Sequence, residues 1–252
     1  MKRAIIIFAL FFWYWGASQT EALFTGATDA YNEGDYEKAI SLYDQIIEKG
    51  EHSAALYFNL GNSYYKLNQI APSIYYYEKA LLLKPADSEI KTNLAYAQNM
   101  TLDAIEVLPE TGISKIYQRI TGRMSFDQWA YTSVVFLVLF VLSYLAFYFL
   151  VYATQKRIAF ICSLTFLMVA VISVIFAFMQ FTQFKADEPA IIFSEEVSVK
   201  SEPNQRSGEA FVLHEGTKVN VLEQLNEYKK IQLVDGKTGW VSSEDIKLLK
   251  DF

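Results

Sequence analysis

Cysteine and histidine are almost absent from this chain of 252 residues. The single cysteine is Cys162, and the two histidines are His52 and His214. One cysteine excludes an intrachain disulfide and a cysteine-based metal site. Neither histidine has a second ligand at metal-binding spacing, so we expect no metal and no cofactor. We also find no nucleophile–base pair outside the apolar segments, and therefore predict that the protein is not an enzyme.

Basic residues are the minority among the charged ones, with 22 Lys and Arg against 28 Asp and Glu. Residues 21–100 and residues 186–252 each carry a net charge of −5, whereas the remainder carries +4. Two acidic modules argue against a nucleic-acid partner. The basic excess lies beside the apolar runs, where anionic lipid headgroups would favour it.

Charged side chains are missing altogether from two long runs, residues 128–155 and 158–184. Each run exceeds the roughly 20 apolar residues that a helix needs to cross a bilayer. We predict transmembrane helices at 126–154 and 158–182. The alternative, a buried hairpin in a soluble core, lacks a segment large enough to cover it. The short connection Thr154–Arg157 contains two basic residues and fits a cytoplasmic turn.

The N-terminus has the order of charges and apolar residues found in secretory signals. Lys2 and Arg3 precede an apolar stretch that ends in small residues at 16–18. This order predicts a signal peptide over residues 1–18, with an uncleaved anchor as the alternative. In either case the two spans return the chain to the side it started from. The modules before and after the hairpin are therefore expected on the same, outer side.

A 34-residue period runs between Thr20 and Pro85. Ala39 and Ser73 occupy the same slot, as do Tyr43 and Tyr77. This spacing resembles the tetratricopeptide repeat, in which pairs of antiparallel helices stack and bind other proteins. The resemblance implies two repeats and a capping helix over residues 20–102. An ordinary helical bundle is the alternative.

In tetratricopeptide arrays the first helix of each pair lines a concave groove that binds extended peptides. By resemblance, aromatic and amide side chains at the matching slots would face this groove. They are Phe24, Thr28, Tyr31, Phe58, Asn62, Tyr65, Lys66, Tyr96 and Asn99. Packing within the short array is the alternative role for each. The slots that clamp a terminal carboxylate in some members hold Phe24, Glu89 and Asn93 here, so that clamp is not expected.

A basic linker, residues 103–125, joins the repeats to the first span. Apolar residues recur at helical spacing from Ile113 to Ile120, among Lys115, Arg119 and Arg123. The pattern fits an amphipathic helix on the outer leaflet, or a plain linker helix. The residues 125–128 then read as a capping box that opens the first span.

From residue 188 to residue 250 the apolar pattern changes to period two, which predicts five or six short strands. Glu215 to Thr217 and Asp235-Gly236 are turn signals, and Gly239-Trp240-Val241 closes the set. The order resembles a bacterial SH3 domain, which implies a small β-barrel that binds cell-wall peptides or proline-containing segments. Tyr228 is the candidate groove residue, whereas Trp240 is expected in the core.

The complete order of elements resembles a BatE-type protein of the Bacteroides aerotolerance operon. The resemblance implies a multidomain chain: an α-helical repeat array, a two-helix transmembrane hairpin and a small SH3-like barrel. It also implies a scaffold in the bacterial inner membrane, with both modules on the periplasmic side. The implied partners are membrane proteins with von Willebrand A domains, beside a MoxR-type ATPase in stress tolerance. A membrane anchor that binds peptidoglycan is the alternative function.

Overall fold

The computed structural model describes residues 19–103, 105, 112 and 119–251. The predicted signal peptide and most of the predicted amphipathic segment lie outside these described residues. The chain divides into two compact units. One combines the N-terminal helices with the C-terminal sheet, and the other contains the two long apolar helices.

Paired helices build the N-terminal part of the first unit. Helical residues 19–33 are followed by α2 (Tyr36–Glu48), α3 (Ala54–Lys66), α4 (Ile70–Leu83) and α5 (Ser88–Gln98). Three of these helices begin at a residue whose side chain accepts a hydrogen bond from one of the first backbone amides. Asp35, Ser53 and Asp87 cap α2, α3 and α5 in this way. Such caps satisfy amides that have no partner within the helix.

Tyrosines and small residues form the core of the helical part. Tyr43, Tyr57 and Tyr77 are fully buried together with Ala39. At Gly61 the ring of Tyr77 comes so close that an added Cβ would lie 2.6 Å from its Cδ1 atom. The absence of a side chain at Gly61 therefore lets α3 and α4 approach closely.

Seven antiparallel strands form the C-terminal sheet. They are β1 (Pro189–Ile192), β2 (Glu196–Lys200), β3 (Glu209–His214), β4 (Lys218–Leu225), β5 (Tyr228–Gln232), β6 (Thr238–Ser242) and β7 (Ile246–Leu248). A single 3₁₀ turn, Ser243–Asp245, separates the last two. An apolar cluster that includes Ile192, Val199 and Ile231 fills one face of the sheet.

The strand order is β3-β2-β6-β5-β4-β1-β7, which is that of an open sheet with β3 and β7 at its edges. This differs from the closed barrel that the sequence predicts. A break in register follows Val199, and β2 meets β6 through the single pair Lys200 and Trp240. The alternating pattern predicts the strands, but it does not fix whether the edge strands β3 and β7 pair to close a barrel.

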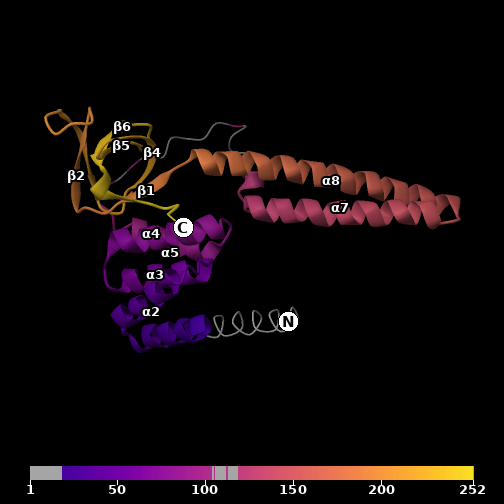
Figure 1. Ribbon diagram of the computed structural model, residues 1–252, viewed down its shortest axis with the longest axis horizontal. Helices are drawn as coiled ribbons and strands as arrows, with labels where there is room; N and C mark the ends of the chain where they lie inside the picture. The colour runs from indigo at the N-terminus through magenta and orange to yellow at the C-terminus, as the bar shows by residue number, and fades with distance from the viewer. Residues whose placement is uncertain (1–18, 104, 106–111, 113–118, 252) are drawn as a thin grey trace, which may run out of the picture. The chain divides into compact units, whose positions relative to one another are not determined.

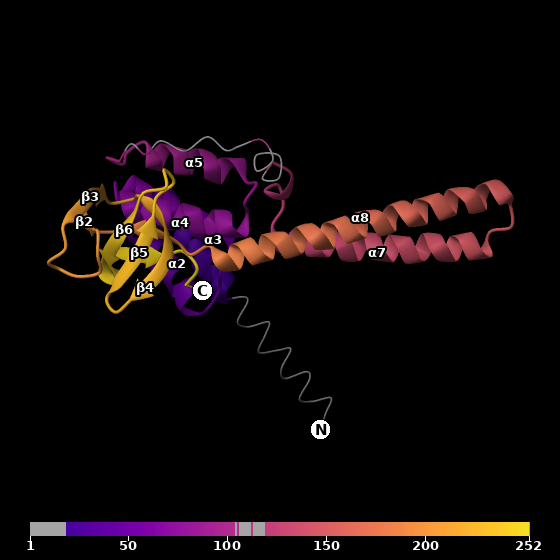
Figure 2. The ribbon, with the colours of Figure 1, turned by 90° about the horizontal axis from the view of Figure 1, so that it is seen from above.

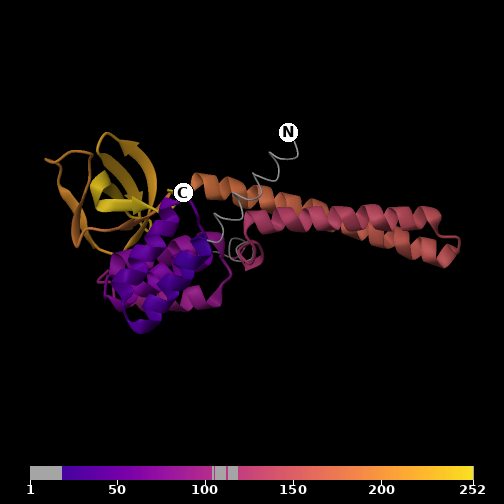
Figure 3. The same ribbon diagram turned by 60° about the horizontal axis from the view of Figure 1, so that its bottom comes forward.

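The sheet and the helices of the first unit share one apolar core. Ile191 of β1 and Leu249, which directly follows β7, belong to the cluster that contains Ile74 and Tyr75 of α4. Figure 1 shows α4 between the sheet and α3, and Figure 3 shows the sheet beside the helical part. The described helices and the C-terminal sheet therefore fold against each other.

The second unit consists of α7 (Phe126–Phe149) and α8 (Ala153–Ala186), which run side by side (Figure 2). The predicted capping box is present, because Ser125 and Gln128 exchange hydrogen bonds. Aromatic contacts join the helices, with ring centroids 5.1 Å apart for Trp129 and Phe176. Both helices are long and apolar enough to cross a membrane.

The turn between these helices lies at residues 150–152 and not at Thr154–Arg157. Leu150 and Tyr152 have extended backbones, and Lys156 N already donates to Tyr152 O. The two basic residues thus lie in the first turns of α8. The sequence signal for the turn is the pair of basic residues. These charges show which end of the hairpin is polar, but they do not show at which residue the second helix begins.

Candidate binding surfaces

Six of the nine predicted groove residues line one pocket on the repeats. The pocket encloses about 310 Å³. From the predicted set it contains Tyr31, Phe58, Asn62, Tyr65, Lys66 and Tyr96. It also contains Tyr77, Glu89 and Asn93. The pocket thus presents aromatic rings, amides, one lysine and one glutamate, a mixture suited to a polypeptide.

Asn62 lies at the centre of a hydrogen-bond network in this pocket. Its Oδ1 accepts from the Tyr77 hydroxyl at 2.7 Å and from Asn93 Nδ2 at 2.8 Å. Burial raises the pKa of Tyr77, so its hydroxyl remains a neutral donor at physiological pH. Within the described part of the chain no hydrogen bond uses Asn62 Nδ2. That donor is therefore available to a peptide carbonyl.

Three predicted groove residues do not line this pocket. Thr28 Oγ1 donates to Phe24 O at 2.9 Å and lies 3.2 Å from the Tyr43 hydroxyl. The Phe24 ring packs edge-on against Tyr43, with centroids 5.6 Å apart. Asn99 is the C-terminal cap of α5. Phe24 and Thr28 thus make packing contacts inside the first repeat, the alternative role that the sequence left open.

Tyr77 was not expected in the groove, because it fills a core slot of the second helix. Its ring packs on Gly61, and its hydroxyl reaches the pocket through Asn62. Glu89 and Asn93 occupy slots that clamp a terminal carboxylate in some tetratricopeptide proteins, and the sequence does not predict such a clamp here. Lys66 is the only basic residue in the described lining of the pocket, which also contains the acidic Glu89. This charge balance does not favour a free carboxylate.

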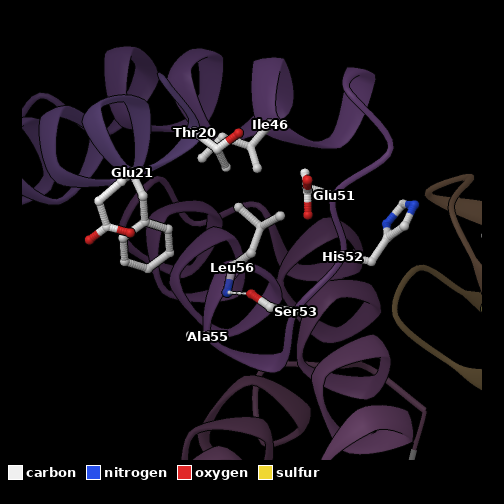
Figure 4. A pocket seen from close by; sticks show the side chains of 9 residues that line it. Thr20, Glu21, Ile46, Glu51, His52, Ser53, Ala55 and Leu56 are labelled. Carbon is white, nitrogen blue, oxygen red and sulfur yellow. Dashed lines mark hydrogen bonds between the residues drawn. The ribbon is translucent and has the colours of Figure 1, made fainter. Parts of the chain in front are cut away.

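A second pocket of about 280 Å³ lies at the start of α3 (Figure 4). Its polar lining includes Glu21, Glu51 and His52, and Phe24 contributes an aromatic ring. Ser53 Oγ, also in the lining, accepts from Leu56 N at 3.1 Å, which is the N-terminal cap of α3. Among the described residues no three His, Cys, Asp or Glu are placed to hold a metal ion.

On the sheet, Tyr228 is half-buried at the start of β5, opposite Leu225 and Ser242. Trp240 faces Lys230 across the next strand, and the Lys230 ammonium lies 5.8 Å from its ring centroid. Trp240 is only 8% exposed. Tyr228 is thus the more accessible of the two aromatic side chains.

Comparison with protein families identifies both modules. Residues 54–87 match the tetratricopeptide repeat, and residues 195–247 match the bacterial SH3 domain. A search of curated proteins found no match. The chain therefore contains a repeat and a domain that indicate a role in protein interaction or cell-wall binding. Its two long apolar helices indicate association with a membrane.

Proposed function

We propose that the protein is a membrane-anchored scaffold that binds an extended segment of another protein in the repeat groove. The observation that carries this proposal is the pocket in which aromatic rings surround the Asn62 and Asn93 amides. Amide side chains bind the peptide backbone, and aromatic rings supply the apolar contact area. The proposal assigns no catalytic role to any side chain.

The proposed topology places the repeats and the sheet on the same side of the membrane. Two spans separate them in the sequence, so the connectivity returns the chain to one side. Their shared core supports this arrangement, because Ile191 and Leu249 pack with α4. We propose the periplasmic side of the inner membrane, from the N-terminal signal pattern and the bacterial SH3 match.

The resemblance to BatE-type proteins makes membrane proteins with von Willebrand A domains the candidate partners, and stress tolerance the candidate process. Such partners would reach the groove from the same membrane. A segment that enters the groove in an extended form needs neither a free C-terminus nor a strong charge, in line with a lining that contains one lysine, Lys66, and one glutamate, Glu89.

Tyr96 allows a test of groove binding that leaves the fold intact, because its side chain is 58% exposed at the pocket. Full-length protein with Tyr96→Ala would be purified from gently solubilised native membranes beside wild type and Leu102→Ala. Leu102 is 77% exposed and lies outside the pocket lining. We expect Tyr96→Ala to reduce the recovery of partner proteins by about tenfold, as aromatic contacts in interfaces do. Equal recovery in all three samples would contradict groove binding.

A second function, binding to peptidoglycan, is favoured by the match of residues 195–247 to bacterial SH3 domains. The full chain in nanodiscs would be sedimented with purified wall material, as wild type and as Tyr228→Ala. Sedimentation that Tyr228→Ala abolishes would support wall binding through the sheet. Protein that stays in the supernatant would leave the scaffold as the better account.

A further inference from the structure

We propose that the C-terminal sheet is a built-in cap on the outer side of α4, and that a polar latch ending at Asp251 holds it there. The cap keeps the second repeat ordered before any partner binds. Two repeats are a short array, and repeat arrays need their terminal apolar surfaces covered. Helix α5 covers part of α4, and the sheet covers another part.

Helix α4 is buried on almost every side, which its sequence does not explain. Ile74 and Tyr75 are buried, and so are the charged residues Glu78 and Lys79, at 6% and 5% exposure. Lysine and glutamate are rarely so buried unless they are paired. Glu78 pairs with Lys218 of β4, and Lys79 pairs with Asp251, which follows β7.

The apolar part of the contact is close. The rings of Tyr75 and Phe193 meet edge-on, with centroids 5.5 Å apart. At the turn before β4, a Cβ on Gly216 would lie 2.9 Å from both Ile74 Cδ1 and Thr101 Cγ2. Only a residue without a side chain fits there, and its positive φ of 83° also favours glycine. The turn that marks the SH3-like sequence is thus in contact with the repeats.

The latch is a set of polar contacts between α4 and the end of the chain. The Tyr75 hydroxyl donates to Asp251 Oδ2 at 2.7 Å and approaches Leu248 O at 3.2 Å. Lys79 forms an ion pair with Asp251. Farther along, Lys218 Nζ donates to Glu78 Oε2 at 2.6 Å. Because Lys79 is buried, loss of Asp251 would leave a buried charge without this partner.

A second anchor fixes the sheet to the segment after α5. Asp103 accepts three hydrogen bonds from the sheet, from His214 N at 2.8 Å, His214 Nδ1 at 2.7 Å and Thr217 Oγ1 at 2.6 Å. Burial alone would raise the pKa of Asp103, but these bonds offset it and hold the pKa below its ordinary value. The carboxylate is therefore charged at neutral pH.

The groove and the latch meet on one helix. Tyr77 reaches Asn62 in the groove, whereas Tyr75 and Lys79, two positions before and after it, contact Asp251. A movement of α4 away from the sheet would therefore disturb the Tyr77 hydroxyl as well. The cap thus acts on the groove through the position of α4.

Hydrogen exchange measured by mass spectrometry on the full chain in nanodiscs, without a partner, tests the cap. We expect Asp251→Ala to accelerate exchange in residues 70–83 on the order of tenfold, with no change in residues 228–242. Asp235→Ala is the matched control, because Asp235 pairs with Lys237 in the β5–β6 turn, at 2.9 Å. This control should leave residues 70–83 as in wild type.

Tyr75→Phe provides a milder variant, since it removes the hydroxyl and keeps the ring. It should accelerate exchange in the same residues by a smaller factor. Exchange in residues 70–83 that is equal in Asp251→Ala, Tyr75→Phe and Asp235→Ala would overturn the cap. Because no partner is present, this outcome would leave the proposed binding in the groove unaffected.

Discussion

Helix α4 contains Glu78 and Lys79 and is buried nearly all round, whereas α7 contains one charged residue, Asp127, and has no buried residue. The difference lies in what covers each helix. For α4 the chain supplies the cover, from α3 and α5 and from the sheet at the far end of the sequence. Among the described residues α7 packs along α8, and the length and apolar composition of both helices indicate association with a membrane.

The largest effect on the difference between α4 and α7 is expected when a charge is placed in the middle of α7. Val138 is 53% exposed in the structure, and Leu102 is 77% exposed. If lipid surrounds Val138, then Val138→Arg costs about 3 kcal/mol of insertion free energy. Water surrounds Leu102, so Leu102→Arg should leave the insertion free energy unchanged. Membrane fractionation with alkaline extraction measures both, and equal retention of the two variants would argue against a membrane span.

A smaller effect is expected from a methyl group inside the repeats. Gly61→Ala places a Cβ 2.6 Å from the Tyr77 ring, and overpacking of this kind costs about 2 kcal/mol of unfolding free energy. Gly26→Ala is the control, since its Cβ would meet Leu42 at 3.8 Å, an ordinary contact. Denaturant unfolding of the full chain should show a loss for the first variant only. A stable Gly61→Ala protein would mean that α3 and α4 are not so closely packed.

Acid should weaken the packing of the C-terminal sheet on α4 and leave α7 unaffected. In Asp251, burial would raise the pKa of the carboxyl, but hydrogen bonds from Lys79 and Tyr75 bring it below its ordinary value, as happens in Asp103. A lowered folded-state pKa gives stability that is present above the ordinary value near 3.8 and lost as the pH falls through the folded value. Thermal unfolding followed by circular dichroism should thus lose stability only at strongly acid pH.

The control for this pH dependence is a double variant, Asp103→Asn with Asp251→Asn. It should be less stable than wild type at pH 7, and its remaining loss on acidification should be smaller. If wild type and the double variant lose the same stability between pH 5 and pH 2, other carboxylates cause the acid effect.

The smallest effect is expected at the entry to α7. Ser125→Ala removes the cap that accepts from Gln128 N at 3.2 Å, which costs about 1 kcal/mol of helix stability. Ser125→Asp preserves a cap and should restore the wild-type value. Hydrogen exchange of residues 126–130 measures the fraying directly. Identical exchange in Ser125→Ala and Ser125→Asp would show that the membrane, and not the cap, fixes this end.

The sequence predicted those features that depend on local spacing. The 34-residue period predicted a tetratricopeptide repeat, which residues 54–87 match, and six of the predicted groove residues lie together in one pocket. Period-two alternation and turn signals predicted the strands of the SH3-like sheet. In each case the residues that interact are close in sequence, or are related by a known repeat.

Contacts between distant segments were not predicted. No local pattern predicts the burial of Glu78 and Lys79, because their partners Lys218 and Asp251 lie 140 and 172 residues away. A pattern of charges does not reveal which distant charge it will meet. The same reason explains the open sheet order, since pairing between the edge strands β3 and β7 depends on tertiary packing.

A charge-swap cycle at Glu78 and Lys218 tests most directly whether the repeat helices and the C-terminal sheet fold as one unit. Glu78→Lys alone and Lys218→Glu alone should each destabilise the full-length protein, because each places two like charges at a contact that now measures 2.6 Å. The account predicts that the double variant recovers at least about 1 kcal/mol of unfolding free energy beyond additivity. Strictly additive losses would show that the sheet does not rest on α4 in solution, and would contradict the account.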